Sequence, residues 1–158
     1  KVLQNLLREK VPIRDIRTIA ETLIDSAART KDPEQLTAAA RIALGRLIVQ
    51  TIYGHTEALD VITLDPELEQ LLIRARQQGQ ADTPAIEPGM AERLQRSIAT
   101  ACERQEISGK PSVLLVAGAV RSLLSRFVRF SHRLVHVLSY EEIPDNRQIT
   151  VVATIGRS

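Results

Sequence analysis

The spacing of the apolar residues changes near residue 57, and this change restricts the fold more than any other feature of the chain. Up to that point the apolar residues follow the 3.6-residue period of a helix. Beyond it, short apolar runs at 59–64, 113–116 and 149–155 alternate with helical stretches, which is typical of strands in a sheet. We therefore predict an α+β protein, with a helical subdomain over residues 1–56 and an α/β subdomain over residues 57–158.

One helix is especially clear, over residues 32–54 of the helical subdomain. Asp32 is placed to cap its first turn, and Pro33 occupies a helical position where a missing N–H has little cost. Gln35 can complete a capping box, and Gly54 is the natural end of the helix. The sequence thus predicts a single continuous helix between these signals.

The predicted order of elements after residue 57 is β-α-α-β-α-β-β, which gives a small mixed sheet with helices packed on it. The last two strands flank Pro144, Asp145 and Asn146, three residues that favour a tight turn. We expect these strands to form a β-hairpin, with acids at its exposed tip. The acids are Glu141, Glu142 and Asp145.

No combination of residues in the sequence predicts catalysis or a bound cofactor. Cys102, the only cysteine, lies on the apolar side of a predicted helix, so we interpret it as a core residue. His132 and His136 are four residues apart, but zinc patterns need more ligands than this span supplies. We therefore predict a protein without enzyme activity, metal or cofactor.

A run of arginines without acids lies between Gly118 and Tyr140. A helix face of this kind can meet an acidic partner, a phosphate backbone or anionic lipid. The alternative is a solvated face whose charges are balanced by the acids that follow it. We name the run as a candidate face for an acidic partner; its members are Arg121, Arg126, Arg129 and Arg133.

The first two predicted helices support a different hypothesis, a helix-turn-helix that binds nucleic acid. The segment IRDIRTIAE would be the reading helix, with Arg14 and Arg17 approaching DNA. Asp15 and Glu21 are interleaved with these arginines, and the net charge of +2 is small for a nucleic-acid binder. Nucleic-acid binding therefore stays the alternative function, and we expect no nucleic-acid partner.

Several stretches resemble the C-terminal cytoplasmic region of the flagellar type III export gate proteins, the FlhA family, which includes the gate proteins of virulence secretion systems. They are VLQNLLREKVPIRDIRTIAETLIDSA, LTAAARIALGRLI, TLDPELEQLL and VLSYEEIPDNRQITVVATIG. The resemblance runs over nearly the whole chain in the same order. It implies a fragment of a longer protein, consisting of a helical subdomain and an α/β subdomain of thioredoxin-like topology without a redox motif.

The resemblance also implies a function. Proteins of this family form a ring, expected to be a nonamer in the full-length protein, at the cytoplasmic face of the bacterial inner membrane. They dock export chaperone–substrate complexes and cooperate with the export ATPase complex and the substrate-specificity switch protein. The helical subdomain would face neighbours in the ring, which makes Arg14, Asp15 and Arg17 candidate ring contacts.

Overall fold

The computed structural model describes residues 1–56, 58–78, 88–129 and 135–156. The described residues form two compact units. We call the first, from Lys1–Glu57 and Glu141–Arg147, the helical unit, and the second, from Ala58–Tyr140 and Gln148–Ser158, the α/β unit. The predicted division at residues 56 and 57 assigned Glu141–Arg147 to the α/β part, whereas the structure groups this segment with the helices.

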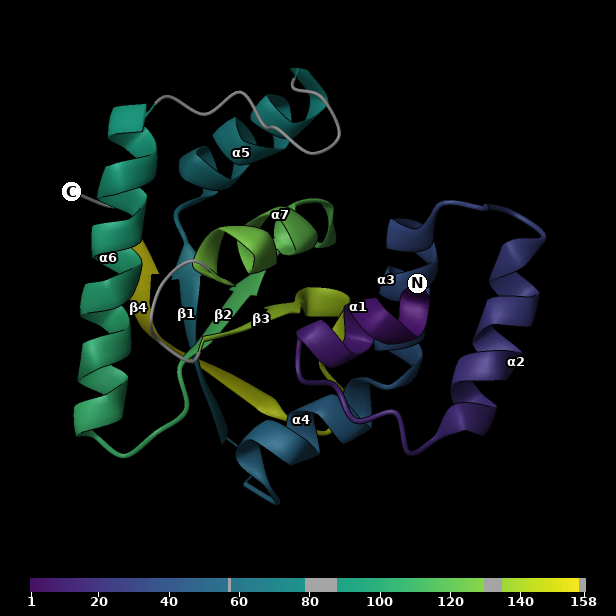
Figure 1. The fold of residues 1–158 in the computed structure, drawn as a ribbon. Helices are drawn as coiled ribbons and strands as arrows, with labels where there is room; N and C mark the ends of the chain where they lie inside the picture. The colour runs from purple at the N-terminus through teal and green to yellow at the C-terminus, as the bar shows by residue number, and fades with distance from the viewer. Residues whose placement is uncertain (57, 79–87, 130–134, 157–158) are drawn as a thin grey trace. The chain divides into compact units, whose positions relative to one another are not determined.

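The helical unit consists of short helices (Figure 1), and two of them have side-chain caps at their starts. Asp15 accepts a hydrogen bond from the Thr18 N–H at the start of the second helix, and Asp32 accepts one from the Glu34 N–H at the start of the third. The four helices are α1 (Val2–Arg8), α2 (Ile16–Ala27), α3 (Pro33–Ala43) and α4 (Gly45–Tyr53).

The continuous helix expected over residues 32–54 is divided in two. Helix α3 ends at Ala43, Leu44 leaves the helical conformation, and α4 begins at Gly45. A glycine favours such a break because it loses more conformational freedom in a helix than other residues. The predicted cap at Asp32 and the predicted end at Gly54 are confirmed.

The α/β unit has the predicted order of strands and helices, which confirms the α+β class. Its four strands lie in the order β3-β2-β1-β4, and all three neighbouring pairs are parallel. The sheet is therefore parallel rather than mixed, and the thioredoxin-like label is not confirmed. The elements are β1 (Ala58–Leu64), α5 (Pro66–Gln78), α6 (Pro88–Ile107), β2 (Val113–Val116), α7 (Gly118–Arg129), β3 (His136–Ser139), η1 (Tyr140–Glu142) and β4 (Gln148–Ile155).

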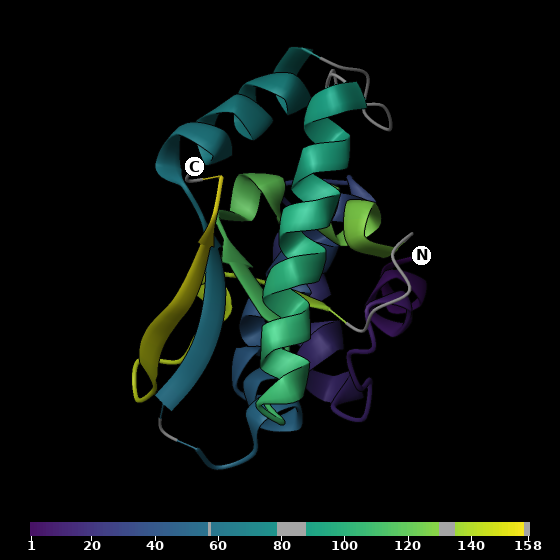
Figure 2. The ribbon, with the colours of Figure 1, turned by 90° about the vertical axis from the view of Figure 1, so that its left-hand side faces the viewer.

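The interior of the α/β unit is aliphatic. Helices α5, α6 and α7 lie beside the sheet (Figures 1 and 2). Their apolar side chains form one buried cluster with those of the strands. Alternate strand residues such as Ile62, Leu64, Leu114 and Val116 belong to this core, as the two-residue period of a strand requires. Cys102 is fully buried in the same core, which confirms its interpretation as a core residue.

The expected hairpin of the last two strands is wrong. Strands β3 and β4 lie at opposite edges of the sheet, with β2 and β1 between them. A two-stranded hairpin requires adjacent antiparallel strands, whereas the connection from β3 to β4 here passes through the helical unit. Among the described residues, none of the helices combines the length and the apolar character needed to cross a membrane.

Candidate functional site

The segment Glu141–Arg147 is held to the helical unit at both of its ends. At one end, the Glu142 carboxylate accepts hydrogen bonds from the Arg41 Nε and Nη2 groups, at 3.1 and 3.0 Å. At the other end, the Arg147 guanidinium donates to the carbonyl oxygens of Gly54, at 2.9 Å, and Thr56. These carbonyls follow α4, so Arg147 places a positive charge where the helix leaves acceptors unsatisfied.

The centre of this arrangement is a charged triad, formed by the buried Arg41 and Glu142 and the partly buried Glu9. The side chains of Arg41 and Glu142 are each only 2% exposed, and Arg41 Nη1 also lies 2.7 Å from Glu9 Oε2. The paired contacts to Glu142 use the planar fork of the guanidinium, the strongest geometry for a carboxylate. Removal of one member of such a buried group leaves a charge without its partner, which is strongly destabilising.

Gly45 allows the segment to approach the helices closely. A Cβ atom at this position would lie 2.3 Å from the Glu142 carbonyl oxygen, a distance shorter than any real contact. The glycine at the start of α4 therefore serves two purposes. It permits the break between α3 and α4, and it leaves space for the backbone of the segment.

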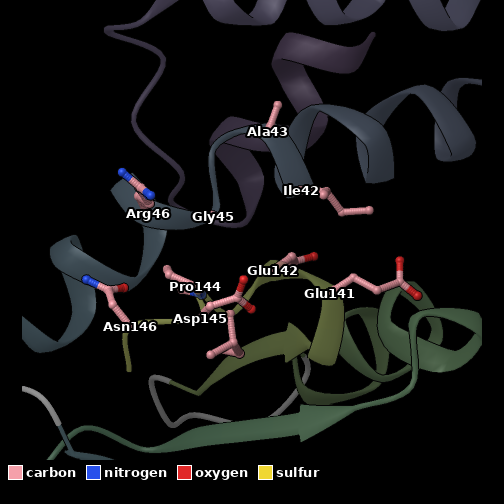
Figure 3. Close-up of a pocket in the computed structure, with 10 residues that line it drawn as sticks. Ile42, Ala43, Gly45, Arg46, Glu141, Glu142, Pro144, Asp145 and Asn146 are labelled. Carbon is pink, nitrogen blue, oxygen red and sulfur yellow. The ribbon is translucent and has the colours of Figure 1, made fainter. Parts of the chain in front are cut away.

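A shallow hollow of about 450 Å³ lies between the α3–α4 junction and the segment. Figure 3 shows Ile42, Ala43, Gly45 and Arg46 on one side of the hollow, and Glu141, Glu142, Pro144, Asp145 and Asn146 on the other. Glu141, Asp145 and Arg46 are all exposed. Ile42 is also exposed, so the wall offers both charge and apolar area. Such a surface suits contact with another protein better than chemistry.

A family model described as the FHIPEP family matches residues 1–148 of the chain. The chain belongs to the FHIPEP family. The family resemblance inferred from the sequence is thereby confirmed. The FHIPEP chain is 53% identical to the flagellar biosynthesis protein FlhA of Salmonella typhimurium and 52% identical to FlhA of Escherichia coli, each over 156 residues. Each match covers 99% of this chain and 22% of the relative, so the chain spans about a fifth of their length.

Solved structures of related proteins share the fold of the FHIPEP chain. The Chlamydia pneumoniae CdsV protein, solved in complex with CdsO, matches with a TM-score of 0.87 at 28% identity, covering 97% of this chain and 45% of that chain. Nonameric EPEC SctV-C matches with a TM-score of 0.82 at 30% identity, covering 98% of this chain and 46% of that chain.

The sequence predicted the turn in the Glu141–Arg147 segment but not its surroundings. The Arg147 N–H donates to the Pro144 carbonyl at 3.2 Å, which closes a turn at Asp145 and Asn146. Glu141 and Asp145 are exposed as expected, but the exposed position predicted for Glu142 is wrong. Burial of Glu142 is stable because Arg41 satisfies both of its carboxylate oxygens.

The three predicted ring contacts lie together around the start of α2. Arg14 is exposed, and Arg17 forms an exposed ion pair with Glu21, at 3.2 Å. Asp15 caps α2: the Thr18 side chain and then the Thr18 backbone donate to its carboxylate, and these hydrogen bonds lower the pKa of Asp15. Their role in a ring stays a prediction.

The same geometry disfavours the helix-turn-helix alternative. Helix α2 begins only at Ile16, so the first residues of the proposed reading segment lie outside it. The Asp15 carboxylate occupies the helix N-terminus, where it would repel a DNA phosphate. Arg17 is already paired with Glu21.

The structure leaves fewer arginines exposed on the candidate face of α7 than the sequence predicted. Arg121 is only 5% exposed, so its predicted place on an exposed face is wrong. The reason is its position on α7, since it precedes the buried Leu124 and Val128 by three and seven residues. Arg126 is half-buried and Arg129 is exposed, whereas Arg133 lies outside the described residues.

The described part of the FHIPEP chain contains no group of three or more His, Cys, Asp or Glu side chains that could hold a metal ion. In the α/β unit, partial burial and then the nearby Glu69 carboxylate raise the pKa of Tyr140. Both effects disfavour the charged phenolate. Neither observation places a nucleophilic side chain beside a general base.

The sequence reasoning missed Arg41, Gly45 and Arg147. A partial signal for Arg41 was present, because it lies three and seven residues before Leu44 and Ile48 and therefore shares their buried helix face. Its partner Glu142 is 101 residues away, and no local pattern connects the two.

Proposed function

We propose that this chain is a protein-contact part of a type III export gate on the cytoplasmic side of the bacterial inner membrane, without enzyme activity. The single observation that carries the proposal is the match to nonameric EPEC SctV-C over 98% of the chain. The identity of 53% to Salmonella FlhA favours the flagellar branch of the family. In this role the chain forms a ring with other copies of its parent protein.

The proposed partners are export chaperone–substrate complexes, the export ATPase complex and the substrate-specificity switch protein. The solved complex of CdsV with CdsO supports the general point that a chain of this fold contacts a second protein. The hollow beside Gly45 offers exposed charged and apolar side chains for such a contact. Arg126 and Arg129 remain the proposed face for an acidic partner.

Arg14, Asp15 and Arg17 remain proposed ring contacts. Charge pairs at such a surface set orientation more than affinity. Exchange of Arg14 for Glu in a complete cytoplasmic region should weaken self-association in sedimentation without a change in thermal stability. Unaltered self-association would remove Arg14 from the ring interface. Ala20→Ser, an exposed change on the same helix, is the matched control.

A chimaera tests the proposed function. In Salmonella typhimurium, this chain replaces the matching 156 residues of FlhA, and flagellar protein in the medium is measured. We expect secretion from the chimaera and none from FlhA that lacks the segment, provided that both proteins reach the membrane. Normal secretion without the segment would contradict the proposal.

A further inference from the structure

The hollow at the α3–α4 junction is lined by charged side chains that the fold itself does not use. Glu142 also lines it, but the Glu142 carboxylate is satisfied by Arg41. By contrast, the side chains of Arg46, Glu141 and Asp145 are exposed and form no hydrogen bond or ion pair within the described residues. Their hydrogen-bonding capacity is therefore available to a partner.

The charges have opposite signs on the two sides of the hollow. Figure 3 shows Arg46 on the side of α4, and Glu141 and Asp145 on the side of the segment. The carboxylates outnumber the guanidinium, so the hollow attracts a cation, whereas Arg46 repels a segment with several basic residues. This pattern selects a single basic group that has an acidic group close to it.

Apolar side chains line the same hollow. Ile42 is 43% exposed, and Ile143 and Pro144 are half-buried. The hydrocarbon stem of an arginine packs on such a surface while its guanidinium reaches a polar group. The planar guanidinium also fits carboxylates with more defined geometry than the ammonium group of lysine. Arginine is therefore the basic side chain that complements both the acids and the apolar surface.

The walls of the hollow are held in place by the fold. The Glu141–Arg147 segment is anchored by the hydrogen bonds of Glu142 with Arg41 and by those of Arg147 with the carbonyls that follow α4. Gly45 lets the backbone of the segment lie directly against the start of α4. A site with ordered walls loses less conformational freedom when a partner binds.

We propose that this hollow binds an arginine side chain of a partner protein, presented on an extended segment with an acidic residue near the arginine. The arginine pairs with Glu141 and Asp145, and the acidic residue pairs with Arg46. The volume of about 450 Å³ lies within the roughly 300–1,000 Å³ of ligand sites, which suits a short peptide segment. The inference rests on the proposed function, because it takes the role of the chain to be contact with other proteins.

The probe is the peptide GSRLDSG with blocked ends, titrated into the complete isotope-labelled chain while amide NMR signals are measured. We expect the signals of Gly45, Glu141 and Asp145 to shift. Asp145→Lys should weaken binding roughly five- to tenfold, because an attractive charge pair becomes repulsive. The matched control is Asp25→Lys, the same change at an exposed acid of α2, which should bind the peptide like the unchanged chain.

A second peptide distinguishes lost complementarity from a disturbed fold. The peptide GSELDSG has an acid in place of the arginine, and it should bind Asp145→Lys more tightly than it binds the unchanged chain. A misfolded variant would not gain affinity in this way. If circular dichroism shows that Asp145→Lys is unfolded, Glu141→Lys replaces it, with the same expected exchange of peptide preference.

No binding of GSRLDSG, or equal binding by Asp145→Lys and the unchanged chain, overturns the inference. Shifts confined to residues outside the hollow also overturn it. The same holds if guanidinium chloride at the concentration of the peptide produces the same shifts, since the rest of the segment would then contribute nothing. Self-association through the hollow that excludes the peptide overturns it as well, because the occupant would be a second copy.

The chimaera experiment reports separately on the proposed function. Secretion by the chimaera without any binding of GSRLDSG rejects this inference alone. Binding of the peptide together with normal secretion by FlhA that lacks the segment rejects the proposed function.

Discussion

In the α/β unit the interior is a continuous cluster of aliphatic side chains, whereas in the helical unit an arginine and a glutamate are buried as an ion pair beside a second, partly buried glutamate. The α/β cluster draws its members from every strand and from three helices. The charged triad joins the C-cap residue of α1, helix α3 and the last residue of η1, from three distant parts of the sequence. Apolar contacts tolerate many partners, but a buried charge needs a particular partner in a particular place.

This difference means that the two units should respond differently to mutation. A lost methyl group in the aliphatic cluster leaves a cavity whose cost depends on local relaxation. A lost member of the triad leaves an uncompensated charge, and the loss affects every element that the triad joins. The stability of the helical unit should therefore depend on Glu141–Arg147, although this segment is far from the four helices in the sequence.

The largest effect is expected for Arg41→Leu. The change leaves the Glu142 and Glu9 carboxylates without their shared partner, and should lower the free energy of unfolding by about 3–5 kcal/mol. Urea denaturation followed by circular dichroism measures the loss. The control is Arg46→Leu, an exposed arginine on the next helix, for which we expect a change within about 0.5 kcal/mol.

The double variant Arg41→Leu with Glu142→Leu sharpens this test. It removes both members of the most buried pair, so its loss should be smaller than the sum of the two single losses by about 0.5–3 kcal/mol. Additive losses would show that the ion pair has no special energetic role.

A somewhat smaller effect is expected for Leu124→Ala in the α/β unit. Leu124 is almost fully buried in the aliphatic cluster, and its truncation should cost about 2–4 kcal/mol through lost contacts and a cavity. Leu71→Ala, at a half-exposed leucine on α5, is the matched control and should cost less. Similar losses at both positions would indicate that the cluster is not the stabilising interior of this unit.

Gly45→Ala should have an intermediate effect. The new Cβ overlaps the Glu142 carbonyl, and the resulting displacement should cost about 1–2 kcal/mol even after the better helix propensity of alanine is included. Thermal unfolding measures it. Gly89→Ala in α6 is the control, because a Cβ there meets nothing within 4 Å, and it should stabilise or leave the protein unchanged. A stabilised Gly45→Ala protein would show that the segment does not lie against α4.

The smallest effect is expected for Asp15→Ala, and it should depend on pH. Hydrogen bonds from Thr18 lower the pKa of Asp15, so its contribution to stability is present above the unfolded value of about 3.9. The contribution is lost as the pH falls through the lower pKa of the folded protein. The melting temperatures of the unchanged chain and the variant should therefore differ at pH 7 and converge in acid.

Asp15→Asn retains an oxygen that can accept the Thr18 hydrogen bonds, so it should preserve more of the stability at pH 7. Asp25→Ala, an exposed acid on the same helix, controls for the loss of charge. A constant difference between Asp15→Ala and the unchanged chain at all pH values would contradict the role of the carboxylate.

Local patterns in the sequence determined the element types, the order of the strands along the chain, the cap at Asp32, the end at Gly54 and the turn after Pro144. Each of these depends on residues within a few positions of one another, so periodicity and capping chemistry are sufficient to predict them. The family resemblance could likewise be inferred from the sequence, because each family motif is a contiguous stretch of residues.

Only the tertiary structure decided which strands are neighbours and where the Glu141–Arg147 segment lies. Adjacent acids in the sequence, Glu141 and Glu142, have opposite environments because only one of them meets Arg41. The parallel sheet places β3 and β4 at opposite edges, although the turn between them looked like that of a hairpin. Strand pairing and buried charge pairs join residues that are far apart in the sequence, and their energies depend on the surroundings that the complete fold creates.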